Sequence, residues 1–245
     1  MKLIKSFIAW VLVIGSFVFH ALIAPIVTLF KKGQDKEDGY YWSSVPFVTN
    51  SLKIAGVKIK TSGLANLPPK GPIVLIANHQ SILDIWICMA AIPLKIGFFA
   101  KEELLKVPIL GSDIYHQGHF FVDRNNPRKA VKQMKRVKEK IKKGHVVMIF
   151  PEGTRSSDFK IASFKRGAFQ IALEAGATIV PIYIDGSGRV LPKNRLLITP
   201  KPVSIHIGKA LKAELNGKGL MLRAKELTQQ FEIYMKEMEA GFATK

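Results

Sequence analysis

The longest apolar run of the chain lies at its N-terminus. No charged residue occurs in residues 7–30, and lysines flank the run on both sides. About 20 apolar residues suffice to cross the hydrocarbon core of a bilayer, so this run is long enough. A secretory signal peptide is the alternative, but its apolar core would be shorter and residues 21–24 form a poor cleavage site. The pattern favours a retained membrane segment, which we expect in one leaflet because His20 and Pro25 interrupt it.

A weaker apolar segment follows after a polar stretch. Residues 33–39 are polar and bounded by glycines, and they predict a turn. Residues 40–56 carry aromatic and aliphatic side chains at helical spacing, including Trp42 beside two tyrosines, which suits a membrane interface. An ordinary packed helix fits these residues equally well. Residues 1–56 are therefore predicted to form a membrane-associated segment of two helices.

From residue 57 onward the pattern alternates between short apolar strands and amphipathic helices. Such alternation is typical of an α/β domain, here residues 57–245, with a mostly parallel layered sheet flanked by helices. Strands are predicted at residues 57–60, 72–77, 96–100, 146–150, 178–184 and 203–207, and helices at 81–92, 127–143, 165–175 and 219–239.

Composition narrows the class of protein. The chain has 245 residues, of which 48% are hydrophobic, so a substantial core is possible and global disorder is excluded. Lys and Arg number 37 against 18 Asp and Glu, and the formal net charge of +19 favours a polyanionic partner. The single cysteine, Cys88, excludes an internal disulfide framework and is expected in the core. The histidines show no metal-ligand spacing, so no metal site is predicted.

Residues 127–143 form the most basic segment of the chain. They carry nine Lys and Arg residues against Glu139 alone, together with an apolar stripe at helical spacing. The stripe predicts a face that packs on the core. The basic face is either simply solvated or attracted to anionic lipid, at about 1 kcal/mol per basic residue near the surface. We favour lipid attraction, and an acidic acyl carrier protein is a second candidate partner for this face.

Residues 78–84 (Asn-His-Gln-Ser-Ile-Leu-Asp) directly follow a buried strand. They therefore lie at the carboxyl end of that strand, where open α/β sheets bind ligands. His79 and Asp84 can meet only if the chain turns between them, and a helix starting at Ser81 supplies that turn. A carboxylate on one imidazole nitrogen leaves the other free to act as a general base. The alternative is a capping box that merely starts the helix.

Residues 150–156 (Phe-Pro-Glu-Gly-Thr-Arg-Ser) end another strand and can share the same crevice. Gly153 permits a close backbone approach, Thr154 can donate a hydrogen bond to an oxygen anion, and Arg155 offers a planar fork for phosphate. A solvated surface turn with a Glu152–Arg155 pair is the alternative.

Residues 118–124 (Gly-His-Phe-Phe-Val-Asp-Arg) form the third segment with candidate chemistry. Arg124 closes a short apolar run and could reach the same edge of the sheet. The alternative is an ordinary salt bridge with Asp123 at the end of a strand.

Together the three segments resemble the membrane glycerolipid acyltransferases, and most closely the bacterial 1-acyl-sn-glycerol-3-phosphate acyltransferases. That family carries Asn-His-x-x-x-x-Asp, Gly-x-x-Phe-Ile/Val-Asp-Arg and Phe-Pro-Glu-Gly-Thr-Arg-Ser in this order. A fourth apolar block with a central proline is matched by residues 179–182. The resemblance covers roughly residues 57–210, and the ordered set is far more specific than any one motif.

The resemblance implies a role for each matching residue. His79 would be the general base on the acceptor hydroxyl, and Asp84 its orienting carboxylate. Arg124 would bind the phosphate of the acceptor. The remaining implied residues contact the substrate: Glu152, Gly153, Thr154 and Arg155 would line the acceptor site, Lys101 would add a cation or be a solvated loop lysine, and Lys165 is a weaker candidate.

The resemblance also implies the reaction. A fatty acyl group would pass from acyl-CoA or acyl-ACP, as co-substrate and without a further cofactor, to 1-acyl-sn-glycerol 3-phosphate, giving phosphatidic acid. The partners would be membrane lipids, with the active site on the cytoplasmic side of a bacterial inner membrane. Two alternatives stay open: a sister enzyme acting on glycerol 3-phosphate or another lysophospholipid, and a non-catalytic, membrane-anchored lipid-binding protein. Nucleic-acid binding is disfavoured because no basic motif interleaved with aromatic residues occurs.

Overall fold

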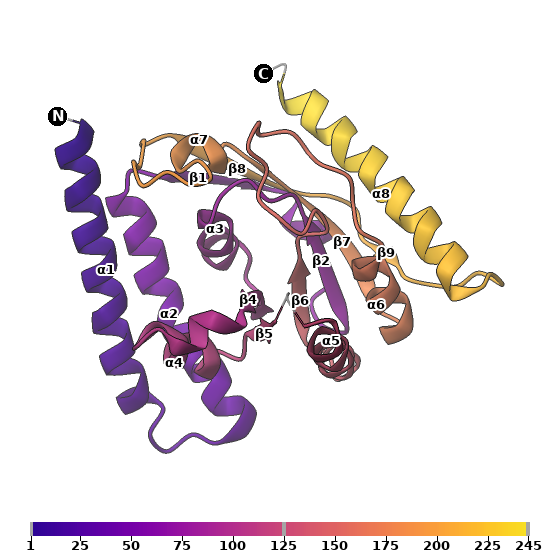
Figure 1. Cartoon of the computed structure of the whole chain (residues 1–245), viewed down its shortest axis with the longest axis horizontal. Helices are drawn as coiled ribbons and strands as arrows, with labels where there is room; N and C mark the ends of the chain where they lie inside the picture. Colours follow the sequence, from indigo (N-terminus) through magenta and orange to yellow (C-terminus); the bar gives the residue numbers. More distant parts are fainter. Residues whose placement is uncertain (1, 124–125, 244–245) are drawn as a thin grey trace.

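A computed structural model describes residues 2–123 and 126–243, with an N-terminal helical hairpin packed beside an α/β domain (Figure 1). The hairpin consists of α1 (Lys2–Val27) and α2 (Gly33–Ile54). One face of α1 is buried through Ala9, Val13 and Ala24. These residues are about one and three helical turns apart, so they lie on the same side of the helix. The opposite face leaves large apolar side chains exposed. They are Phe7, Ile8, Val11, Leu12, Ile14, Phe19, Leu22, Ile26 and Val27.

Within the described residues, one helix is long and apolar enough to cross a membrane. It covers Ser6–Val27, with a mean hydropathy of 2.3 over its most apolar window. His20, which would be costly in lipid, is buried against protein: its Nδ1 lies 3.3 Å from Asp113 Oδ1 and its Nε2 lies 3.1 Å from Ser43 Oγ. The polar interruption of the apolar run is therefore turned away from the exposed face.

The expected turn at residues 33–39 is wrong, because α2 already begins at Gly33. The chain reverses direction before α2, at residues 28–32. The polar residues are held in the helix by side-chain contacts that the local pattern does not reveal. Gln34 donates to Asp38 Oδ1 one helical turn away, and Lys95 Nζ lies 2.7 Å from the same oxygen.

The main sheet is mostly parallel, as predicted. The order across the sheet is β1 (Lys58–Ser62), β8 (Pro202–Ile207), β7 (Thr178–Asp185), β2 (Ile73–Ala77), β6 (Val146–Ile149) and β3 (Ile96–Gly97), with β9 (Leu211–Lys212) pairing with β7. Strands β7 and β2 lie at its centre, and β7, β2, β6 and β3 run parallel to one another. Strand β8 is antiparallel to β7, and β1 is parallel to β8.

Helices cover both faces of this sheet, which confirms the expected fold class (Figure 1). One face packs against α3 (Leu83–Ala91) and the hairpin. The other face packs against α5 (Pro127–Lys142), α6 (Gly167–Ala175) and α8 (Leu220–Ala243). The hairpin shares the core of the first face through Tyr41 and Leu52, both fully buried. The division at residue 56 stays a prediction.

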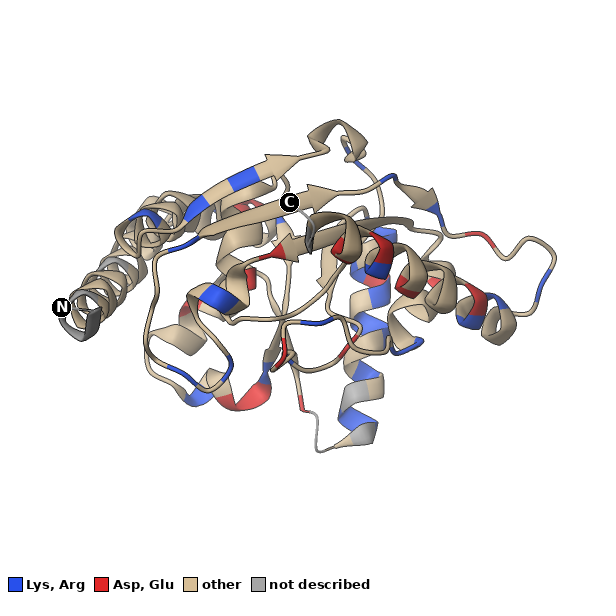
Figure 2. Ribbon diagram, turned by 90° about the horizontal axis from the view of Figure 1, so that it is seen from above, with Lys and Arg blue, Asp and Glu red and all other residues tan. Residues whose placement is uncertain are grey.

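Figure 2 shows the basic residues gathered along α5. Its predicted apolar stripe is confirmed, because Val137 and Ile141 are fully buried. Some basic side chains of this helix are engaged with protein carboxylates, as Lys138 is with Glu174 and Lys140 with Glu37. The attraction of the remaining exposed basic face to lipid stays a prediction.

The predicted strand at residues 96–100 is wrong as a single element. The chain leaves the main sheet after β3 and forms β4 (Phe99–Lys101), which pairs with β5 (Phe120–Val122) in a separate two-stranded sheet. Gly97 lies against the ring of Phe120 at the break, where a Cβ would come within 2.5 Å of that ring. Further short elements carried no clear sequence signal. They are the 3-10 turns Leu64–Asn66 and Glu102–Lys106, α4 (Leu110–His116) and α7 (Ser187–Val190).

Candidate active site

The site is built where parallel strands end side by side. Asn78, the first residue after β2, joins this strand to β7 through its side-chain amide. Its Nδ2 donates to Ile184 O at 2.8 Å, and Ile184 N donates to its Oδ1 at 2.7 Å. Because Asn78 is buried and both halves of its amide are paired, the turn that carries His79 leaves the sheet in a fixed direction.

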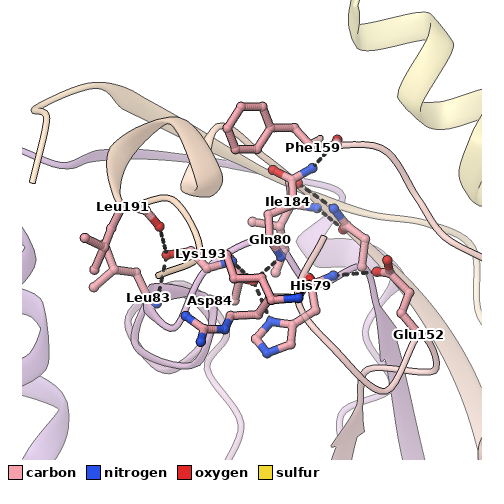
Figure 3. A network of polar contacts seen from close by, with 12 residues as sticks. His79, Gln80, Leu83, Asp84, Glu152, Phe159, Ile184, Leu191 and Lys193 are labelled. Carbon is pink, nitrogen blue, oxygen red and sulfur yellow. Dashed lines mark hydrogen bonds and ion pairs between the residues drawn. The ribbon is translucent and has the colours of Figure 1, made fainter. Parts of the chain in front are cut away.

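His79 and Asp84 are in contact (Figure 3). Nδ1 of His79 lies 2.8 Å from Oδ2 of Asp84, whose side chain is fully buried. The same oxygen accepts hydrogen bonds from Gln80 N at 2.8 Å and Ser81 N at 2.9 Å. Asp84 therefore caps the turn before α3 and also contacts the imidazole, so the capping interpretation and the catalytic one describe the same carboxylate.

The ring of His79 is fixed in orientation and partly open to solvent. It stacks on Phe150, with ring centroids 4.0 Å apart and planes 17° apart, and its side chain is 18% exposed. Since Asp84 can only accept, the geometry assigns the proton to Nδ1 and leaves a lone pair on Nε2. Among the residues that the structure describes, no hydrogen bond reaches Nε2. This nitrogen is available to accept a proton.

Glu152 faces the backbone rather than open space. Its Oε1 accepts from His79 N at 2.7 Å and its Oε2 from Ala162 N at 3.0 Å. Burial raises the pKa of this carboxyl group to about 7, although the two N–H bonds act in the opposite direction. Glu152 thus connects the loop after β6 to the turn that carries His79, a placement that the motif alone did not predict.

The loop after β6 brings Gly153, Thr154 and Arg155 close to this turn. Ser156 N, at its far end, donates to His79 O at 2.8 Å. Gly153 has φ +74°, and a Cβ there would come within 2.7 Å of Lys165 Nζ, so the side chain of Lys165 lies against this position. Thr154 is exposed and Arg155 is partly exposed.

Lys193 is a neighbour of this loop that the sequence analysis missed. Its Nζ donates to Thr154 Oγ1 at 3.2 Å and to Arg155 O at 2.9 Å. The residue stands alone between Pro192 and Asn194 in a connecting segment, and no local pattern marks it.

Lys101 and Arg124 are not brought to the turn of His79 by any described contact. Lys101 ends β4 in the separate two-stranded sheet and is exposed. Arg124 lies outside the described residues, as does its expected pairing with Asp123. Lys129 Nζ lies 3.6 Å from Asp123 Oδ2. The roles expected for Lys101 and Arg124 stay predictions.

Cys88 is fully buried, as expected for a core residue, and burial raises the pKa of its thiol. Among the described residues, no three His, Cys, Asp or Glu side chains gather as the ligands of a metal ion would.

Comparison with known proteins identifies the family. A family model described as Acyltransferase matches residues 58–185, the part of the chain that holds both motif loops around His79. The chain belongs to this family. The resemblance inferred from the motifs is thereby confirmed.

Individual relatives agree with this assignment. A 1-acyl-sn-glycerol-3-phosphate acyltransferase of Chlamydomonas reinhardtii is 34% identical over 90% of this chain and 66% of its own length. One from Pseudomonas aeruginosa is 34% identical over 76% of this chain and 71% of its own. The crystal structure of the 1-acyl-sn-glycerophosphate (LPA) acyltransferase PlsC of Thermotoga maritima superimposes with TM-score 0.76 and 27% identity, covering 98% of both chains. The chain spans 66% or less of the length of the algal and plant relatives that it matches.

Proposed function

We propose that the chain transfers a fatty acyl group from an acyl thioester to the sn-2 hydroxyl of 1-acyl-sn-glycerol 3-phosphate, forming phosphatidic acid. The observation that carries this proposal is the contact between His79 Nδ1 and Asp84 Oδ2, which leaves Nε2 open at the ends of the parallel strands. The names of the relatives from Chlamydomonas reinhardtii, Pseudomonas aeruginosa and Thermotoga maritima support the choice of acceptor.

In the proposed mechanism His79 is the general base. Its Nε2 takes the proton of the acceptor hydroxyl, and the oxygen attacks the thioester carbonyl as the bond to sulfur breaks. Asp84, through Oδ2, holds the ring in the required tautomer and stabilises the imidazolium that forms. The departing thiolate receives the proton from His79, so the base is regenerated. A thioester is already activated, and the scheme therefore needs no covalent enzyme intermediate.

Cationic residues around this turn suit a phosphorylated acceptor. The side chain of Arg155 makes no ion pair with any described residue, so its guanidinium is free to take a phosphate. Arg124 and Lys101 are proposed as further phosphate contacts from the motif resemblance. The donor in this proposal is acyl-CoA or acyl-ACP, whose phosphopantetheine arm is also anionic.

The hairpin is proposed to attach the enzyme to one leaflet, on the cytoplasmic side of a bacterial inner membrane. The exposed face of α1 is apolar, and His20 is turned inward to Asp113 and Ser43. Both substrates carry acyl chains, and exposing each methylene to water costs about 0.8 kcal/mol. An enzyme seated at the lipid surface avoids extracting them.

A thiol-release assay tests this function. Purified protein in phospholipid micelles receives acyl-CoA or acyl-ACP together with 1-acyl-sn-glycerol 3-phosphate, glycerol 3-phosphate or a lysophospholipid without a free phosphate. We expect thiol release and phosphatidic acid with the first acceptor, and loss of both in His79→Ala. Preference for another acceptor would indicate a sister enzyme. Lipid binding without thiol release from either donor would indicate a non-catalytic protein.

A further inference from the structure

Residues 191–198, which follow α7, contact both motif loops at one end. Leu191 O accepts a hydrogen bond from Ser81 Oγ at 2.8 Å, in the turn between His79 and Asp84. Two residues later, Lys193, which is labelled in Figure 3, donates through Nζ to Thr154 Oγ1 and Arg155 O. This connecting segment, called the strap below, thus touches the site from outside the recognised motifs.

The other end of the strap binds the N-terminal helix. Trp10 Nε1 donates to Leu196 O at 2.6 Å, and Ile198 N donates to Ser6 Oγ at 2.9 Å. Ser6 is buried, so this contact is not a loose surface one. In Figure 1 the chain that follows α7 lies beside the N-terminal part of α1, in agreement with these bonds. The strap therefore joins α1 directly to the loop that carries Thr154 and Arg155.

We propose that Lys193 is a positioning residue that holds the loop carrying Thr154 and Arg155 in place relative to helix α1. This inference rests on the proposed function, because the loop is taken as part of the acceptor site. Its consequence is that seating α1 in lipid favours acceptor binding through the strap.

The donor chemistry of Lys193 suits this role. An ammonium group has three N–H donors and no acceptor, and two of them are used on consecutive residues of one loop. Thr154 and Arg155 take no other hydrogen bond from the residues that the structure describes. The neighbouring amides of Gly153 and Ser156 are held independently, by Phe150 O and His79 O. The middle of the loop therefore depends on Lys193.

The geometry of the strap makes transmission from α1 efficient. Only Asn194 and Arg195 lie between Lys193 and Leu196, and these three residue steps span at most about 11 Å even when fully extended. Arg195 N also donates to Pro192 O at 3.2 Å, which ties the chain together across Lys193. A shift of Trp10 is therefore expected to move the backbone that carries Lys193. Leu196 is 78% exposed and binds α1 beside the apolar face that includes Phe7 and Val11. Lipid that covers this face would also contact the outer end of the strap.

The test uses the full chain in phospholipid micelles, with two independent readouts. The first is hydrogen–deuterium exchange of peptides covering residues 150–158. The second is the Michaelis constants for 1-acyl-sn-glycerol 3-phosphate and for acyl-CoA. The variants are Lys193→Met, Lys193→Arg as the conservative rescue, Trp10→Phe, which removes the indole N–H and keeps an aromatic ring, and Lys201→Met as control. Lys201 is an exposed lysine whose side chain makes no hydrogen bond or ion pair with any described residue.

For Lys193→Met we expect about tenfold faster exchange of the loop and an acceptor KM about tenfold higher, as for the loss of one charge-assisted hydrogen bond. The donor KM and kcat should stay within about twofold, a split that general destabilisation would not produce. Lys193→Arg should restore both values. Trp10→Phe should act in the same direction, and its effect should vanish in the Lys193→Met background.

Two results would overturn the inference: exchange and acceptor KM of Lys193→Met equal to those of Lys201→Met, or a Trp10→Phe effect that simply adds to that of Lys193→Met. The exchange readout needs no turnover. If the wild-type protein releases no thiol, the proposed function fails while exchange still decides whether Lys193 holds the loop.

Discussion

Oδ2 of Asp84 accepts a hydrogen bond from Nδ1 of His79 and also from the backbone N–H of Gln80 and Ser81. One buried carboxylate oxygen therefore takes three donors from the turn that leads into α3. The backbone bonds fix the place of Asp84 before any substrate binds, and His79 is oriented by a group that is itself immobile. Removing the charge of Asp84 and removing its acceptor oxygens should consequently have different effects.

His79→Ala should lower turnover by about 10²–10⁴-fold, the usual effect of losing a general base. The side chain is partly exposed and makes its hydrogen bond with Asp84 alone, so the folded structure should persist. Steady-state thiol release gives the rate, and a thermal melt of the same sample checks the fold. Turnover near that of the wild type would show that His79 is not the base.

Asp84→Asn should impair turnover with little loss of stability, because the amide oxygen can still accept the N–H bonds of the turn. The imidazolium then lacks its compensating charge, and the ring can adopt the wrong tautomer. Asp84→Ala should lose turnover and also stability, by about 2 kcal/mol or more, since buried N–H groups are left unpaired. Urea unfolding compares the two variants. Equal stability of both would contradict the capping role of this carboxylate.

Glu152 should make stability depend on pH. Burial raises its pKa from 4.5 to about 7, so the folded chain binds this proton more tightly than the unfolded chain. The stabilisation is fully present below about pH 4.5 and is lost as the pH rises to about 7. Against Glu152→Gln, which cannot ionise, the wild type should lose at most about 3 kcal/mol of unfolding free energy over this range. A difference between the two proteins that does not change with pH would refute the shifted pKa.

Much of the fold followed from local pattern. The buried strand β2 is a continuous apolar run, and α6 ends at Gly176 in the left-handed region, as expected of a helix C-terminus. The predictions were wrong where contacts with residues distant in the sequence determine the secondary structure. Residues 33–39 are helical with support from Lys95, and the strand expected at residues 96–100 divides because β4 pairs with β5.

In the candidate site too, some features could be predicted from the local sequence and others depend on contacts made by the fold. The spacing of His79 and Asp84 already required a turn between them, since residues five apart do not lie on the same face of a regular helix. The direction of the Glu152 carboxylate was not predictable, because its partner Ala162 belongs to a loop without a motif. Lys193 contacts Thr154 only because the fold brings the two residues together. A single lysine in a loop belongs to no motif, so the sequence did not indicate its position.

Arg155→Ala and Arg124→Ala should each raise the KM for the acceptor by about tenfold or more, with smaller effects on the donor. A guanidinium–phosphate pair is present in both the ground state and the transition state, so its loss weakens binding more than it slows the chemical step. Arg166→Ala is a suitable control, because Arg166 is an exposed arginine nearby whose side chain makes no described contact. A variant with unchanged acceptor KM and raised donor KM would reverse the assignment.

A charge placed on the exposed face of α1 should release the protein from lipid. Deleting residues 1–56 is a poor test, because Tyr41 and Leu52 of α2 are buried in the core of the α/β domain and their loss would destabilise it. Val11→Glu instead adds one charge to an exposed side chain. A charge deep in lipid costs about 2–3 kcal/mol, so binding to vesicles should weaken by up to about 100-fold.

Asn50→Glu is the matched control for this change, because it adds the same charge to an exposed polar residue of α2. It should leave vesicle binding nearly unchanged. Flotation with vesicles of neutral lipid at high salt separates apolar anchoring from attraction to the basic face of α5. Val11→Glu should also lose activity on long-chain acceptors while retaining it on short-chain, water-soluble ones, which need no extraction from a bilayer. If Val11→Glu floats as well as Asn50→Glu and acts normally on long chains, the anchor lies elsewhere than on α1.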